Sequence, residues 1–318
     1  MRMRAALLAP KYWQTWIGLG ILRLVEPLPY SVRMMLGRVV GKLLYHLPLA
    51  YVRIARRNIA LCFPERTEED RQRLLRSHFE NLGIGIFETA VTWWSSNERV
   101  RKLAKIEGLE HLQAALARGK GAILVGGHFT TIEIATRILG TLVPMNVLYR
   151  PTKNEVLAEI FAHHFARFAQ RAIRHDDIRS LIRALKENGA VWYAPDQSYQ
   201  KKGAAMVPFF GIDAATTTAT SRLAKLTGAA VLTYFPERLP GNQGYRVVIS
   251  PPLDHYPSEC AVSDAARFGR LLEAHIRRIP EQYFWVHRRF KGLMPGYPNY
   301  YGRDTRAKAP SPSTPVES

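Results

Sequence analysis

The sequence predicts an α/β fold in which a largely parallel central sheet is flanked by helices. Apolar runs bounded by glycine or proline, such as GAILVGGH and AVWYAPD, are typical of buried strands. Amphipathic stretches such as TTIEIATRILG lie between these runs and have helical spacing. Strands that alternate with helices indicate a parallel sheet. The last strand pair, AAVLTYFPER and YRVVISPP, is expected to add an antiparallel edge.

The remaining elements follow in chain order. Helices are expected over about 60–105, and the stretch EVLAEIFAHHFARFAQ is predicted to form another amphipathic helix. The stretch ATTTATSRLAKLTG is predicted to be a helix with threonines at its start. We expect three divisions of the chain: a basic, membrane-associating helical segment at 1–57, an α/β domain at 58–303, and a disordered tail rich in proline and serine at 304–318.

The charge balance indicates a polyanionic partner. The 318 residues include 45 Lys and Arg against 26 Asp and Glu, a formal net charge of +19. Nucleic acid, an anionic membrane or a phosphorylated substrate would suit this excess. No zinc-finger, RRM or helix-turn-helix signature accompanies it, so we expect no nucleic-acid partner. Two cysteines, Cys62 and Cys260, are too few for a disulfide scaffold or a cysteine zinc site, and we predict no metal.

The first 57 residues combine bases with aromatic and aliphatic side chains. They contain ten Lys or Arg and one acid, Glu26. The apolar stretch Trp16–Leu22 is short for a membrane span, which takes about 20 residues. A helix in the membrane interface, with Trp13 and Trp16 at headgroup depth, fits better, although a tilted span stays open. The alternative is a buried helical subdomain with a solvated basic rim.

Polar side chains follow three of the predicted strands. The segments are Gly126-Gly127-His128, Tyr149-Arg150-Pro151 and Pro195-Asp196-Gln197. Open α/β sheets bind ligands beyond the carboxyl ends of their strands, so we expect the three segments to converge on one site. Arg150 would clamp a phosphate or carboxylate there, or form a structural salt bridge. Asp196 would hold Arg150 or His128, or cap the following turn.

The segment GGHFTTIE suggests an acid–base pair. His128 ends a strand and Glu133 lies in the first turns of the next helix, so the two meet if His128 folds back over the helix start. A carboxylate that accepts from one imidazole nitrogen leaves the other ready to take a proton from a hydroxyl. Thr130 and Glu133 also have the spacing of a capping box, so a purely structural role stays open.

Two further segments have a functional and a structural interpretation. A basic cluster near the C-terminus consists of His287, Arg288, Arg289 and Lys291. It would bind phosphates or an acidic carrier protein, or it is solvated surface. The apolar run VPFF would line an acyl groove, or it is ordinary core.

Ordered segments along most of the chain match a known family. They are RRNIALCFPE (Arg56–Glu65), GHFTTIE (Gly127–Glu133), YRP (Tyr149–Pro151), VWYAPDQ (Val191–Gln197), VPFFG followed by ATTTATSRLA (Val207–Ala224), and PEQYFWVHRRFK (Pro280–Lys291). Through them the sequence resembles the lipid A biosynthesis acyltransferases, the late (secondary) acyltransferases of Gram-negative bacteria. The lauroyl- or myristoyl-transferring branch looks most similar. These enzymes belong to the wider H-x4-[D/E] glycerolipid acyltransferase superfamily.

The resemblance implies a glycerolipid-acyltransferase-like fold and an acyl-carrier-protein thioester as donor, with no cofactor besides this co-substrate. The acceptor would be a hydroxyl of a Kdo-bearing lipid A precursor, at the cytoplasmic face of the inner membrane and its anionic surface. His128 would be the general base and Glu133 its orienting acid. Substrate-binding roles are expected for Arg150, Arg167, Asp196 and Gln197, with Arg167 as the best match to an arginine that the family has after YRP.

Two other functions stay open at this point. A glycerol-phosphate or lysophospholipid acyltransferase would use the same dyad, although Glu in place of Asp and the HRRFK segment argue against it. A non-catalytic basic protein that binds membranes or nucleic acid would account for the charge. It would leave the His–Glu pair and the polar strand ends without a role.

Overall fold

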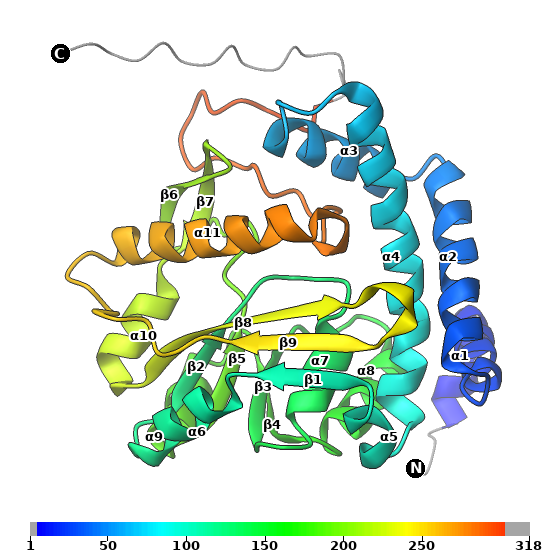
Figure 1. Cartoon of the computed structure of the whole chain (residues 1–318), viewed down its shortest axis with the longest axis horizontal. Helices are drawn as coiled ribbons and strands as arrows, with labels where there is room; N and C mark the ends of the chain where they lie inside the picture. The colour runs from blue at the N-terminus through cyan, green and yellow to red at the C-terminus, as the bar shows by residue number, and fades with distance from the viewer. Residues whose placement is uncertain (1–4, 303–318) are drawn as a thin grey trace.

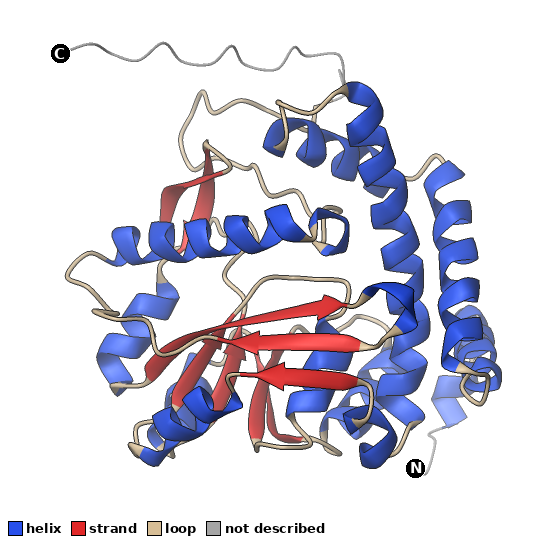
Figure 2. Cartoon of the chain, viewed as in Figure 1, coloured by secondary structure: helices blue, strands red, loops and turns tan. Residues whose placement is uncertain are grey.

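A seven-stranded sheet forms the centre of the structure, a computed structural model that describes residues 5–302 (Figures 1 and 2). The strands are β1 (Ala104–Glu107), β2 (Ala122–Val125), β3 (Met145–Tyr149), β4 (Ala169–Arg174), β5 (Ala190–Tyr193), β8 (Ala230–Arg238) and β9 (Tyr245–Ile249). Their order is β1-β9-β8-β2-β5-β3-β4, and all neighbours pair in parallel except β8 and β9. The predicted parallel sheet and antiparallel pair are confirmed, but β1 and not β9 forms the edge.

Helices cover both faces of this sheet. They are α6 (Leu109–Ala117), α7 (Ile132–Leu139), α8 (Glu155–Phe165), α9 (Ile178–Lys186), α10 (Ala219–Thr227) and α11 (Ala261–Arg278). Along β2, Ile123 and Val125 share a core cluster with residues of α9, α10 and α11, whereas Ala122 and Leu124 share another with α6 and α7. A strand covered on both faces is apolar at every position, which is why AILV is a continuous apolar run.

The N-terminal part of the chain is helical, as predicted. It consists of α1 (Trp13–Val25), α2 (Tyr30–His46), α3 (Ala50–Cys62), the long α4 (Glu68–Trp94) and α5 (Asn97–Arg101), with short 3-10 helices at Ala5–Leu8 and Pro10–Tyr12. Helix α3 runs through the predicted division at 57/58 and buries Ala55 and Ile59 in the main core. Within residues 5–302 no helix has the length and apolar character needed to cross a membrane. The predicted tail at 304–318 lies outside the described residues.

Glycines bring α2 and α4 into close contact. A Cβ atom on Gly41 would lie 2.2 Å from the carbonyl oxygen of Phe79, and one on Gly83 would lie 2.1 Å from the carbonyl oxygen of Gly37. Backbone atoms cannot move aside as a flexible side chain can, so only glycine allows this separation of the helices. The contact packs the N-terminal helices against the rest of the protein, and Figure 1 shows α2 lying along α4.

Gly41→Ala is expected to lower the free energy of unfolding by about 1–3 kcal/mol, because the added methyl group forces α2 away from α4. Gly18→Ala is the matched control, since Gly18 also lies within a helix and no atom would come within 4 Å of its Cβ. That change should be neutral or stabilising by up to about 1 kcal/mol. Denaturant unfolding followed by circular dichroism measures both. Equal stability of Gly41→Ala and the wild type would contradict the close packing.

Neither edge strand of the seven-stranded sheet, β1 or β4, was predicted from the sequence. The structure ends α8 at Phe165 and places β4 at Ala169–Arg174, where the sequence suggested that the helix continues. Only Ile173 of β4 is buried, since β4 has a single neighbour, β3. An edge strand with one buried side chain lacks the apolar pattern by which strands are recognised.

A separate antiparallel hairpin also differs from the prediction. It consists of β6 (Ala204–Phe209) and β7 (Ile212–Thr217), and 3-10 helices follow later at Pro240–Asn242 and Pro280–Gln282. Of the threonines expected to begin a helix, Thr216 and Thr217 lie in β7, which suits their β-branched side chains. Thr218 is the N-cap of α10, which begins at Ala219. Val207 and Phe209 of the VPFF run are buried in the main core, which confirms the structural interpretation of that run.

Candidate active site

His128 lies three residues beyond the end of β2, in a loop that the C-terminal part of the chain fixes in place. The backbone N–H of Phe284 donates to the carbonyl oxygen of His128 at 2.9 Å, and the N–H of Thr130 donates to the carbonyl oxygen of Gln282 at 2.8 Å. Gly127 is closely packed, since a Cβ there would lie 2.6 Å from Cδ1 of Leu272 and would require that side chain to shift. The segment PEQYFWVHRRFK therefore forms one wall of the site.

Asp196, which follows β5, holds the imidazole ring. Its Oδ1 lies 2.6 Å from Nδ1 of His128. Its Oδ2 accepts the backbone N–H of His128 at 2.8 Å and the hydroxyl of Tyr283 at 3.0 Å. The two residues meet because β2 and β5 are neighbours in the sheet. Of the three roles that the sequence left open for Asp196, the structure selects the contact with His128.

The electrostatics of this pair favour a charged carboxylate beside the ring. Burial raises the pKa of Asp196, but the charge of His128 and three hydrogen bonds outweigh burial and lower that pKa to about 2. For His128, burial lowers the pKa, but the charge and hydrogen bond of Asp196 raise it by more. The net result is a pKa above the usual value for histidine. The carboxylate thus stabilises the imidazolium form, and the His128 side chain is still 30% exposed.

Glu133 faces the same cavity but has a different partner. Its Oε2 accepts from the hydroxyl of Thr89 on α4 at 3.2 Å. Among the described residues no hydrogen bond joins it to His128, so the carboxylate that orients the ring is Asp196 and not Glu133 as expected. The capping box is not formed either, since α7 begins without a side-chain cap. Burial and the charge of Glu88 raise the pKa of Glu133. Its part in catalysis stays a prediction.

Two neighbouring cavities open beside these groups. The first, of about 340 Å³, is lined by Leu82, Gly85, Ile86, Glu88, Thr89, His128, Phe129, Thr130, Ile132, Glu133, Ile134 and Phe284. The second, of about 120 Å³, is lined by Thr92, Trp93, Ile132, Glu133, Thr136, Val147, Leu148, Phe161, His164, Phe165, Phe168 and Trp192. Ile132 and Glu133 line both. The second cavity is therefore an aromatic extension of the space beside His128.

The other predicted site residues are distributed differently. Gln197 lines a small cavity together with His128 and Asp196. Arg150 is exposed, and Arg167 donates a hydrogen bond to the backbone carbonyl of Trp93. In the described structure neither arginine lines the two cavities beside His128. Their substrate-binding roles stay predictions.

The basic C-terminal cluster divides into buried and exposed members. Arg289 is buried and donates to the carbonyl oxygen of Ala215 at 2.8 Å, which is a structural role. Nε2 of His287 accepts the backbone N–H of Ser198 at 3.2 Å, and burial lowers the pKa of His287 to about 4. Arg288 and Lys291 are exposed. Sequence analysis did not single out Tyr283, although it lies within one of the matching segments.

This geometry defines an acid–base site of the kind that activates a hydroxyl. A carboxylate holds Nδ1 of the histidine, and a cavity lies beside the ring. Neither cysteine lines the two cavities: Cys62 is buried in the main core, and Cys260 precedes α11. A histidine–carboxylate pair beside a cavity is an arrangement found in enzymes that use acid–base chemistry, group-transfer enzymes among them.

Comparisons with known proteins identify the group that is transferred. Residues 1–292 match the bacterial lipid A biosynthesis acyltransferase family. The chain is 37% identical to the lipid A biosynthesis lauroyltransferase of Escherichia coli (strain K12), over 94% of this chain and 98% of that protein. It is 38% identical to the palmitoleoyltransferase of the same organism, over 92% and 96%, and 24% identical to the myristoyltransferase, over 92% of each. The chain belongs to this family and is an acyltransferase of lipid A biosynthesis.

Proposed function

We propose that this enzyme moves a fatty acyl chain from the thioester of acyl carrier protein to a hydroxyl of a Kdo-bearing lipid A precursor, with His128 as general base. One observation carries the proposal. Asp196 holds Nδ1 of His128, Nε2 forms no hydrogen bond with the described residues, and His128 lines a cavity of about 340 Å³. The hydrogen bond to Asp196 assigns the Nδ1–H tautomer, so the lone pair is on Nε2.

In the proposed reaction Nε2 takes the proton of the acceptor hydroxyl as its oxygen attacks the thioester carbonyl carbon. The new C–O bond forms a tetrahedral oxyanion, and Asp196 stabilises the imidazolium. Collapse of this intermediate breaks the C–S bond, and the imidazolium returns the proton to the leaving thiolate. The aromatic extension would keep water from the thioester, which would otherwise hydrolyse.

The aromatic extension suits the acyl chain. Its walls come from Trp93 on α4, from Leu148 on β3, and from Phe161 and Phe165 on α8. Because it shares Glu133 with the His128 cavity, a thioester carbonyl beside the ring would direct its chain between these rings. The volume of the extension would then limit the chain length.

Phe165→Ala is expected to shift the preferred donor towards longer chains, and Leu148→Phe towards shorter ones. Each methylene in an apolar pocket changes relative kcat/KM by about 10-fold or more. Competition between acyl carrier proteins loaded with chains of different length, read by mass spectrometry of the product, measures the ratio. The two variants control for each other, because a general loss of stability would not shift them in opposite directions. Identical shifts would show that this cavity does not hold the chain.

The outer helices support action at a membrane surface. Exposed apolar side chains recur every three or four residues on α1 and α2, namely Trp13, Ile17, Ile21, Leu24, Met35, Val39 and Leu43. Figure 1 shows both helices on the outer side of α4. An apolar helix face in a chain with net charge +19 is typical of binding to an anionic interface. We infer that these helices lie on the cytoplasmic face of the inner membrane.

The double variant Ile17→Asp, Leu43→Asp is expected to bind phosphatidylglycerol vesicles at least about 10-fold more weakly, because each side chain loses apolar burial. Vesicle flotation of the full chain gives the bound fraction. Leu226→Asp is the control, since Leu226 is 58% exposed but lies on α10. Equal flotation of the double variant and wild type would show that α1 and α2 do not contact the membrane.

Reconstitution tests the proposed reaction as a whole. Purified full-length protein is supplied with acyl-carrier-protein or coenzyme A thioesters, and with lipid A precursor that carries or lacks Kdo. We expect transfer from the carrier protein to the Kdo-bearing acceptor. Faster transfer from coenzyme A would refute the donor, and equal transfer to both acceptors would refute the Kdo requirement.

A further inference from the structure

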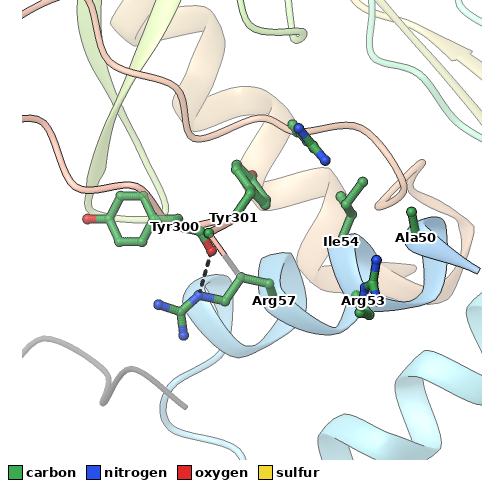
Figure 3. A pocket seen from close by; sticks show the side chains of 8 residues that line it. Ala50, Arg53, Ile54, Arg57, Tyr300 and Tyr301 are labelled. Atoms are coloured by element: carbon green, nitrogen blue, oxygen red, sulfur yellow. Dashed lines mark hydrogen bonds between the residues drawn. The ribbon is translucent and has the colours of Figure 1, made fainter. Parts of the chain in front are cut away.

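The largest cavity among those described here lies away from His128. It has a volume of about 510 Å³, within the range of small-ligand sites. One wall is a single face of α3, and the other is the end of the described chain (Figure 3). Its lining residues are Ala50, Arg53, Ile54, Arg57, Arg288, Tyr300, Tyr301 and Gly302. We call it the arginine cavity.

Three arginines give this cavity its charge. Arg53 and Arg57 come from successive turns of α3, and Arg288 comes from the C-terminal segment. Among the described residues that line it there is no Asp or Glu. A guanidinium group presents planar, paired donors that match a phosphate, and Arg53 and Arg288 together carry the charge that would neutralise a dianion.

Aromatic contacts fix part of the arginine set. Nε of Arg57 donates to the carbonyl oxygen of Tyr300 at 3.2 Å, shown by the dashed line in Figure 3, and its guanidinium carbon lies 5.8 Å from the Tyr300 ring. The guanidinium carbon of Arg288 lies 6.0 Å from the centre of the Tyr301 ring. Arginines held in this way lose less conformational freedom when they bind an anion.

The helix that lines the arginine cavity has exposed apolar neighbours at one end and a contact with the active-site region at the other. Leu47 and Tyr51, beside its first lining residue, are both exposed. On the other side, Asn58 follows Arg57 and donates to the carbonyl oxygens of Trp285 and His287 at 2.6 and 2.7 Å. Asn58 and His287 in turn line the small cavity that contains His128 and Asp196. Helix α3 therefore contributes both to the arginine cavity and, through Asn58, to the small cavity beside His128.

We propose that the arginine cavity binds a phosphate group on the headgroup of the lipid acceptor, through Arg53, Arg57 and Arg288. The proposal rests on the proposed function and adds a subsite to it. A lipid headgroup fits better than an acidic protein, because the arginines surround a concave space and border an apolar surface. Phosphate binding there would set the direction in which the acceptor approaches His128.

The steady-state kinetics of a double variant, Arg53→Gln with Arg288→Gln, test this subsite. For the double variant the KM for the phosphorylated acceptor should rise about 10-fold or more, with kcat within about twofold and the KM for acyl carrier protein unchanged. For a dephosphorylated acceptor the variant and the wild type should have the same KM. Arg56→Gln is the matched control, because Arg56 is an exposed arginine of α3 outside the cavity.

The other outcomes would overturn the proposal. A higher KM for carrier protein would mean that the arginines dock the protein donor, and an equal effect of Arg56→Gln would mean unspecific surface charge. A binding experiment without turnover separates this subsite from the proposed reaction. It measures how the wild type and the double variant bind phosphatidylcholine vesicles that contain the phosphorylated or the dephosphorylated acceptor. Weaker binding of the variant to the phosphorylated acceptor alone would show phosphate binding even if no acyl transfer occurred. Inorganic phosphate that competes as well as the phosphorylated lipid would show a free-phosphate site instead.

Discussion

The His128→Ala enzyme is expected to transfer acyl chains about 10²–10⁴-fold more slowly than the wild type, because it lacks the ring nitrogen proposed to take the proton of the acceptor hydroxyl. The loss should appear in kcat, since the ring acts on the reacting atoms and contributes little to binding either substrate. Steady-state transfer from acyl carrier protein to the lipid A precursor measures it.

A matched control separates chemistry from folding in this experiment. His175→Ala removes an exposed imidazole directly after β4 and should leave the rate unchanged. The backbone bond between Phe284 and His128 does not depend on the side chain, so the loop should keep its place in His128→Ala. The melting temperature should fall, because the buried Asp196 carboxylate loses its charged partner. A fully folded His128→Ala protein with wild-type turnover would refute His128 as the base.

The sequence predicted the central strands better than the peripheral ones. All four residues of β2 are buried, so burial on both faces leaves a short apolar run between glycines that is easy to recognise. The edge strand β4 buries Ile173 alone, and β7 is rich in threonine, which also begins helices. Where tertiary context and not the local pattern determines an element, a single sequence does not specify it.

The site shows the same distinction. The rule that ligands bind beyond strand ends correctly brought His128 and Asp196 together, although 68 positions separate them. Their direct contact depends on β5 lying beside β2, and strand order is not visible in the sequence. The short spacing to Glu133 therefore suggested the wrong partner for the ring. Tyr283 reaches Asp196 from a segment that comes 87 positions later, and no local pattern indicates this contact.

Asp196→Asn is expected to lower kcat by about 10²–10⁴-fold, because an amide keeps the shape of the carboxylate but cannot stabilise the imidazolium. Asp213→Asn is the control, since Asp213 is an exposed residue of β7 and the change in charge is the same. Steady-state rates at saturating donor and acceptor measure the effect. Equal rates for Asp196→Asn and the wild type would refute the role of Asp196.

The pH dependence gives this prediction a signature that loss of stability would not produce. The base acts in its neutral form, so wild-type kcat/KM should fall as the pH drops through the pKa of His128, which Asp196 raises above 6.5. Without the carboxylate, burial alone remains, and burial lowers that pKa. In a plot of kcat/KM against pH, the fall on the acid side (the acid limb) should therefore lie at lower pH for Asp196→Asn than for the wild type. The maximal kcat/KM of the variant should also be lower.

Glu133→Gln distinguishes the two carboxyl groups. Because Glu133 bonds with Thr89 and not with the ring, its replacement should leave the acid limb where the wild type has it, whatever happens to the rate. If Glu133→Gln moved the acid limb and Asp196→Asn did not, this would show that Glu133 and not Asp196 contacts the His128 ring during turnover. The variant that shifts the acid limb thus identifies the carboxylate that sets the basicity of His128, because a carboxylate close to the imidazole raises its pKa.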